Sequence, residues 1–130
     1  MILDKMMNTL LRITVALLGV FFVISGLRWL FEPNNVAEAL GMLLLNGLGR
    51  STQVGDFAAF FLTLGTCVLL GLMTSKRTWY YPSIMLLGFA AAGRLIAWLV
   101  HDAALATNLI VFEMVVAALF MFASRRLAKA

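Results

Sequence analysis

Two charged residues stand inside long apolar stretches of this chain. Arg94 follows the run AAAG, and Glu113 lies within NLIVFEMVV. A charge at the centre of a membrane helix costs about 2.5–3.5 kcal/mol on insertion scales, so such residues are usually paired or functional. The chemistry open to Arg94 and Glu113 is an ion pair, an anion or ligand contact, or proton transfer through the carboxyl group.

Arg94 and Glu113 lie on opposite sides of a short polar break at His101–Asp102. If both flanking segments are helices, each residue lies roughly 14 Å from the centre of the turn, at about 1.5 Å rise per residue. We therefore predict that they face each other as an ion pair, because each charge then offsets the desolvation of the other. Two interpretations remain open: a structural salt-bridge network, and a ligand site or proton relay.

Further ionisable residues fall at similar positions in the other apolar segments. Arg28 lies one turn from Ser25 and from Glu32, and Asp56 lies one turn after Thr52. We predict that one ligand-binding or buried charge network contains a residue from every helix, namely Arg28, Asp56, Arg94 and Glu113. We predict that this network lines a polar pocket that opens to the outer side of the membrane. Its predicted rim consists of Trp98, His101 and Asp102.

Sequence signatures of catalysis and of cofactor binding are missing. The chain has one cysteine and one histidine, so it has no Cys-x-x-Cys pair and no second histidine for haem. It has no Gly-rich phosphate loop and no serine in a nucleophile motif. A metal site needs three or four convergent ligands, and only Asp102 accompanies His101. We expect a protein that is not an enzyme and that has no metal or cofactor.

The composition places these residues in a membrane. Of 130 residues, 63% are hydrophobic and 12% are charged, whereas soluble domains have about 45–50% and about 25%. A bilayer core needs about 20 apolar residues in a helix. The apolar runs predict one all-α domain, an antiparallel bundle of four transmembrane helices at about 12–31, 52–73, 79–100 and 103–123.

Short connections determine which of the predicted helices are neighbours. Residues 75–78 join the second and third spans, and His101–Asp102 joins the third and fourth. Connections of this length produce antiparallel hairpins. Small residues recur four apart between Gly88 and Ala97, which predicts close helix packing along the third span.

The segment from Glu32 to Arg50 differs from the spans. The sequence EPNN ends the first helix, because it provides proline and capping residues. Val36–Leu45 is apolar but too short to cross a bilayer. We predict a short interfacial or re-entrant helix there, either at the membrane surface or in the mouth of the bundle, which ends at the sequence NGLG.

The positive charges predict the orientation. Seven Lys and Arg residues flank one side of the predicted bundle, and only Arg28 and Arg50 flank the other, together with acidic residues. Because cytoplasmic flanks carry the excess of Lys and Arg, both termini should be cytoplasmic. The net charge of +4 is then explained by topology and anionic lipids, and we expect no nucleic-acid binding.

Four sequence elements carry a family resemblance: FEPNNVAEALGM, VGDFAAFFLTLG, AAAGRLIAWLVHD and NLIVFEMVVAALF. With these elements the chain resembles a small four-helix bacterial membrane family of unknown function, related to the DoxX-like proteins. The likeness covers nearly the whole chain and implies a location in the inner membrane. It also implies polar positions at Asp56, Arg94 and Glu113. Because DoxX-like relatives include accessory partners of redox enzymes and assembly factors, it implies an accessory role.

The sequence therefore favours a non-enzymatic membrane protein with an accessory or ligand-binding role. The expected partners are the lipid bilayer, a small amphipathic or lipid ligand, and a membrane protein or a second copy of the chain. Two alternatives remain: a small proton-coupled transporter that uses Glu113, and an accessory subunit of a membrane redox enzyme.

Overall fold

The computed structural model describes residues 1–130, and its regular structure is helical. The elements are α1 (Ile2–Phe31), α2 (Pro33–Ala39), α3 (Gly47–Thr74), the short 3₁₀ turn η1 (Arg77–Trp79), α4 (Tyr80–Val100) and α5 (Thr107–Leu127). Four segments are long and apolar enough to cross a membrane: α1, α3, η1 with α4, and α5. The predicted all-α membrane bundle is confirmed, and the chain is a multi-pass membrane protein by the length and composition of its helices.

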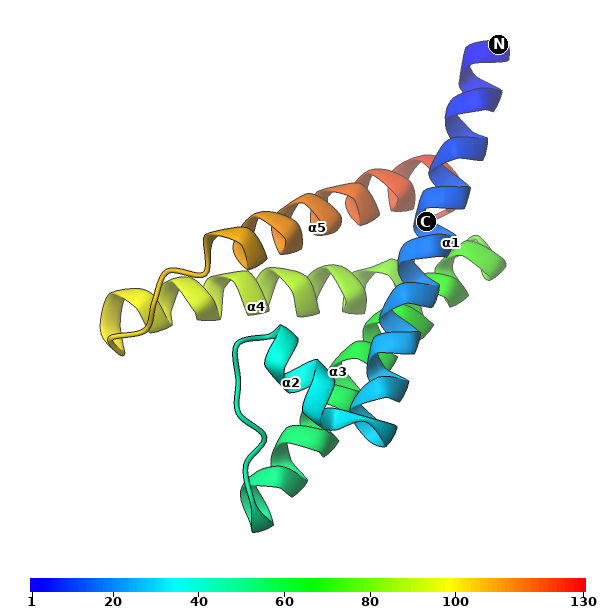
Figure 1. The fold of residues 1–130 in the computed structure, drawn as a ribbon. Coiled ribbons are helices and arrows are strands. Elements are labelled where there is room, and N and C mark those ends of the chain that lie inside the picture. The colour runs from blue at the N-terminus through cyan, green and yellow to red at the C-terminus, as the bar shows by residue number, and fades with distance from the viewer.

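The four long helices form two antiparallel pairs. α1 packs along α3, and α5 packs along α4. The pairs meet near the α3–α4 turn and the C-terminus, and they diverge towards their other ends, so that the molecule is V-shaped (Figure 1). We call the end where they meet the vertex and the other end the open end. A buried apolar cluster joins both pairs, and it includes Phe22, Leu64, Tyr80 and Phe120.

Polar contacts hold the vertex together. The Arg126 guanidinium donates to Asp4 at 2.8 Å and to Asn8 at 2.7 Å. The backbone N–H of Lys129 donates to the carbonyl of Ser75 at 2.8 Å. These contacts bring the first turns of α1 against the C-terminal end, which accounts for a helix that begins at Ile2 and not near residue 12.

The segment after α1 lies at the open end of the molecule. This corresponds to the predicted placement in the mouth of the bundle. α2 lies between the two helix pairs (Figure 1). It begins at Pro33 and ends at Ala39, so the predicted helix over Val36–Leu45 is correct only in its first turn. Residues 40–46 are held instead by the buried Gln53 amide, which accepts from Leu45 N–H at 2.8 Å and donates to Leu43 carbonyl at 3.1 Å. Because Gln53 satisfies these backbone groups, the segment needs no further helical turn.

Two helices begin at other residues than the predicted spans do, one within the segment Glu32–Arg50 and one after the α4–α5 connection. α3 begins at Gly47 and not near residue 52, so the NGLG sequence lies at the start of a helix. α5 begins at Thr107. Residues 101–106 therefore form the connection, which is longer than the expected His101–Asp102 turn. Asp102 has a left-handed backbone with φ of 56°, and Ala103 N–H donates back to the Ala97 carbonyl at 3.2 Å.

Candidate functional site: a cavity between the helix pairs

Arg94 and Glu113 form the predicted ion pair. Arg94 Nε donates to Glu113 Oε1 at 2.9 Å, and the exposed fractions of the two side chains are 33% and 7%. Arg94 lies six residues before the end of α4, and Glu113 lies six residues after the start of α5. The depths match although the predicted turn was too short, because the actual connection is centred on the same part of the chain.

A cavity of about 430 Å³ lies between the two helix pairs. We call it the central cavity. All four long helices and α2 contribute to its walls, and 12 of its 16 lining residues are hydrophobic. Its polar lining consists of four residues: Ser25, Arg28, Arg94 and Glu113. Its volume is within the range of about 300–1,000 Å³ that is typical of small-molecule sites.

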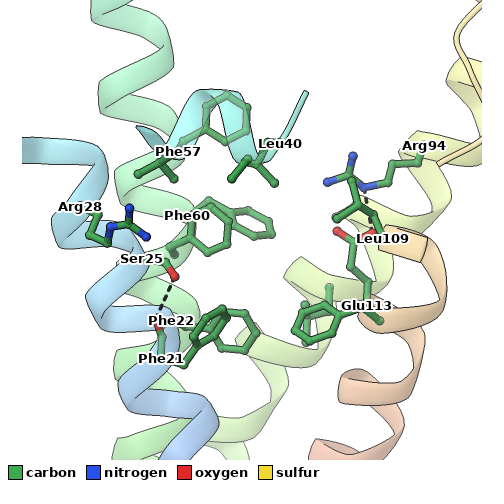
Figure 2. Close-up of a pocket in the computed structure, with 16 residues that line it drawn as sticks. Phe21, Phe22, Ser25, Arg28, Leu40, Phe57, Phe60, Arg94, Leu109 and Glu113 are labelled. Atoms are coloured by element: carbon green, nitrogen blue, oxygen red, sulfur yellow. Dashed lines mark hydrogen bonds and ion pairs between the residues drawn. The ribbon is translucent and has the colours of Figure 1, made fainter. Parts of the chain in front are cut away.

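Phenylalanines form most of the apolar wall. Six of the ten phenylalanines in the chain line the central cavity: Phe21, Phe22, Phe57, Phe60, Phe61 and Phe112. Figure 2 shows several of these rings between the charged side chains of α1 on one side and those of α4 and α5 on the other. An aromatic enclosure of this kind binds apolar groups, because each ring removes a large area of ligand surface from water.

α2 forms part of the same enclosure. Val36, Ala39 and Leu40 line the central cavity, and Leu40 lies near Phe57 at its upper edge (Figure 2). Behind this wall the ring of Trp29 stacks on Phe57, with 4.8 Å between the ring centroids. Trp29 is fully buried, and its indole N–H has no hydrogen-bond partner.

Arg28 lies across the central cavity from Arg94 (Figure 2). Its Nε forms an ion pair with Glu32, one turn further along the chain, and both side chains are about half exposed. In both arginines the hydrogen-bonded atom is Nε, and the Nη atoms make no hydrogen bond within the protein. Each guanidinium therefore keeps donors for a further partner.

The structure separates the remaining predicted site residues from this group. Asp56 is exposed on α3, forms no ion pair and does not line the central cavity. Trp98 is exposed near the end of α4, and His101 and Asp102 are exposed in the connection beyond it. None of these four lines the cavity. Of the predicted network, the structure thus brings Arg94, Glu113 and Arg28 to one cavity.

The aromatic wall and the role of α2 were missed by sequence reasoning. Phe57, Phe60 and Phe61 have the i, i+3, i+4 spacing that places side chains on one face of a helix. That pattern was available, but apolar stripes in membrane helices face lipid as readily as they face a cavity. A concentration of one ring type on facing helices is the signal that distinguishes the two.

The chemistry of the lining favours binding. Ser25 donates its hydroxyl to the Phe21 carbonyl at 2.9 Å, and Glu113 accepts from Arg94, so the lining contains no hydrogen-bonded pair of nucleophile and base. No cluster of three or more His, Cys, Asp or Glu residues could hold a metal ion. The central cavity offers apolar walls and cationic hydrogen-bond donors.

Comparisons with protein families, with curated proteins and with solved structures gave no match to this chain. The class of protein that can be stated is therefore the one that the fold defines, a multi-pass α-helical membrane protein. The relationship to DoxX-like proteins stays a prediction from the sequence elements quoted above.

Proposed function

We propose that this protein is a non-enzymatic protein of the bacterial inner membrane that binds a small hydrophobic or amphipathic ligand in the central cavity. In this proposal both termini are cytoplasmic, and the open end of the V faces outwards. The observation that carries the proposal is the central cavity itself, in which an aromatic wall and charged side chains enclose about 430 Å³. Ligand sites are typically apolar cavities with a few well-placed polar groups.

Filling the central cavity tests this proposal. Ala90 on α4 lines the cavity, whereas Ala92 on the same helix is exposed and lies outside it. We expect Ala90→Phe to abolish saturable binding of a fluorescent alkyl probe, because the ring occupies the space of the ligand. Ala92→Phe adds the same ring to the lipid-facing surface and should leave binding unchanged. Equal binding by both variants would contradict the proposal.

Proton-coupled transport is the second candidate function. It is favoured by one observation: the carboxylate of Glu113 lies in a membrane-spanning helix and on the wall of the central cavity. The ion pair with Arg94 argues against it, because proton transfer through the Glu113 carboxyl group would have to break a hydrogen-bonded pair. Proteoliposomes with an imposed pH gradient distinguish the two, since a transporter shows proton-dependent ligand flux and a binding protein shows none.

An accessory role is compatible with ligand binding, and it rests on the resemblance to DoxX-like proteins. Such a role requires a partner in the membrane, such as a redox enzyme or a second copy of the chain. Mild detergent extraction followed by affinity purification tests this, because a stable partner should co-purify in a fixed ratio to the protein.

A further inference from the structure

We infer that the central cavity binds an anionic amphiphile with a single apolar chain, whose headgroup lies between the guanidinium groups of Arg28 and Arg94. This inference rests on the proposed function and adds to it the sign of the ligand charge and the position of the headgroup.

The sign follows from the charges on the cavity wall. Arg28, Arg94 and Glu113 are the three charged residues of the lining, so the wall itself carries one more positive than negative charge. Glu32, which pairs with Arg28, lies outside the lining and is about half exposed to its surroundings. Electrostatic interactions strengthen in an apolar enclosure, and the charged groups exposed to this one are two guanidinium groups and one carboxylate, which favours an anionic ligand.

The position of the headgroup follows from the free donors. Both ion pairs are made through Nε, which leaves the Nη atoms of Arg28 and Arg94 without a partner. The two guanidinium groups lie on opposite sides of the central cavity (Figure 2). Their planar donor geometry suits carboxylate and phosphate oxygens, which they bind more specifically than a lysine would.

The apolar part of the ligand follows from the remaining wall. The rings of Phe21 and Phe22 lie below both guanidinium groups in the view of Figure 2, so a chain attached to the headgroup would contact them. A volume of about 430 Å³ lies near the lower end of the range for small-molecule sites. One alkyl chain fits this space better than the two chains of a bilayer phospholipid.

Trp29 provides a reporter for the test. It is one of three tryptophans, and Trp79→Phe with Trp98→Phe leaves it as the only one. Because Trp29 stacks on Phe57, a bromine atom on a chain in the central cavity would quench its fluorescence at short range. The probes are an alkanoate, the alkyl phosphate, the neutral alkanol and the alkyltrimethylammonium, all with the same chain brominated on a carbon near the headgroup, added to protein in phosphatidylcholine nanodiscs.

We expect saturable quenching, tightest for the carboxylate and the phosphate and at least tenfold weaker for the ammonium. Charge-assisted hydrogen bonds are strong enough to produce such a ratio. Each added methylene should tighten binding about fourfold until the cavity is full. The relative affinities of the carboxylate and the phosphate then identify the headgroup. Ala90→Phe should remove the saturable component and leave only quenching by probe dissolved in the bilayer.

Charge variants test the role of Arg28. Arg28→Gln should weaken alkanoate binding about tenfold and leave alkanol binding unchanged. Glu32→Gln should tighten alkanoate binding, because it releases Arg28 from its partner. Arg50→Gln removes a positive charge from the same end of the molecule but outside the central cavity, and it should have little effect on either probe.

Two results would overturn the inference and leave the proposed function standing. One is equal saturable binding of all four probes, and the other is tighter binding of the ammonium than of the anionic probes. In both cases Ala90→Phe must abolish the binding, which shows that the probe occupies the central cavity. Absence of saturable quenching by any probe would overturn both the inference and the proposed function.

Discussion

Arg94 and Glu113 illustrate how a membrane helix can contain charged residues. Glu113 is almost fully buried, whereas a third of the Arg94 side chain is exposed. The pair lies at the same depth on two antiparallel helices, so each charge offsets the desolvation of the other. Arg28 and Glu32 meet the same requirement within a single helical turn.

Removal of one partner should therefore destabilise the protein more than removal of both. Glu113→Gln leaves Arg94 without a counter-ion, and breaking a buried pair costs roughly 3–5 kcal/mol. We expect about 3 kcal/mol, the lower end of that range, because Arg94 is partly exposed. The double variant Arg94→Leu, Glu113→Leu should recover much of the loss. Denaturant unfolding of the single and double variants in detergent measures both effects.

A different pattern would support transport. If Glu113→Gln is as stable as the unchanged protein and loses proton-dependent flux, Glu113 acts as a coupling carboxyl and the structural role of the pair is refuted.

The contacts between charged residues were partly predictable from the sequence. Counting residues from the turn gives depth, and depth was enough to pair Arg94 with Glu113. Depth does not give the direction in which a side chain points, so Asp56 was grouped with them although it is exposed on α3. The Arg28–Glu32 pair needs only the i, i+4 spacing and could have been identified directly.

Close contact between helices depends on glycine in the α1–α3 pair. A Cβ atom on Gly65 would lie 2.6 Å from the Gly19 carbonyl oxygen and 2.8 Å from Val23 N, and both are backbone atoms. Such atoms cannot rotate away as a side chain can. α1 and α3 can pack this closely only because both carry glycine at the contact, as small residues allow between membrane helices.

Alanine substitutions at two glycines should therefore have opposite effects. Gly65→Ala should destabilise the protein by about 1–3 kcal/mol, because the two helices must move apart. Gly93→Ala is the matched control, since nothing lies within 4 Å of the added Cβ on α4. It should be neutral or stabilising by up to about 1 kcal/mol, because alanine favours the helix. Thermal unfolding in detergent compares them, and an equal loss in both variants would contradict the packing argument.

The elements were predictable in number and type, but the contacts between them were not. Hydropathy and length predicted all four spans. The spacing of small residues pointed to Gly88–Ala97, yet Gly88 and Gly93 are open, and the tight contact lies between α1 and α3. A small-residue pattern shows that close approach is allowed, but it does not show where a neighbouring helix is.

The two helix pairs are in contact at the vertex and diverge towards the open end. Contacts of Arg126 with Asp4 and Asn8 join α5 to α1 at the vertex. The central cavity and α2 lie between the diverging helix pairs. This divergence was not predictable from hydropathy, because hydropathy determines which segments span the membrane and not the angle at which packed pairs cross. The position of α2 depends on its packing against Trp29 of α1 and Ala58 of α3, which hydropathy does not specify.

The charges differ between the two ends as well. The C-terminus and the α3–α4 turn lie at the vertex, and the first turns of α1 project beyond it on the same side of the molecule (Figure 1). Lys5, Lys76, Arg77 and Arg126 are found in this part of the chain. At the open end Arg28 and Arg50 accompany Glu32 and Glu38. By the positive-inside rule the vertex should be cytoplasmic, and the central cavity should then be reached from the outer side of the membrane.

Labelling of single cysteines can test this orientation. Cys67 is the only cysteine, so Cys67→Ala provides a background without thiols. Asn46→Cys lies at the open end and Ser75→Cys at the α3–α4 turn. A membrane-impermeant maleimide added to intact cells should label Asn46→Cys, and it should label Ser75→Cys only after the membrane is permeabilised. Because two sites on opposite ends are compared in the same background, poor expression of one variant cannot imitate a reversed result. Labelling of Ser75→Cys in intact cells, with Asn46→Cys protected, would place the vertex outside and make the ligand enter from the cytoplasmic side.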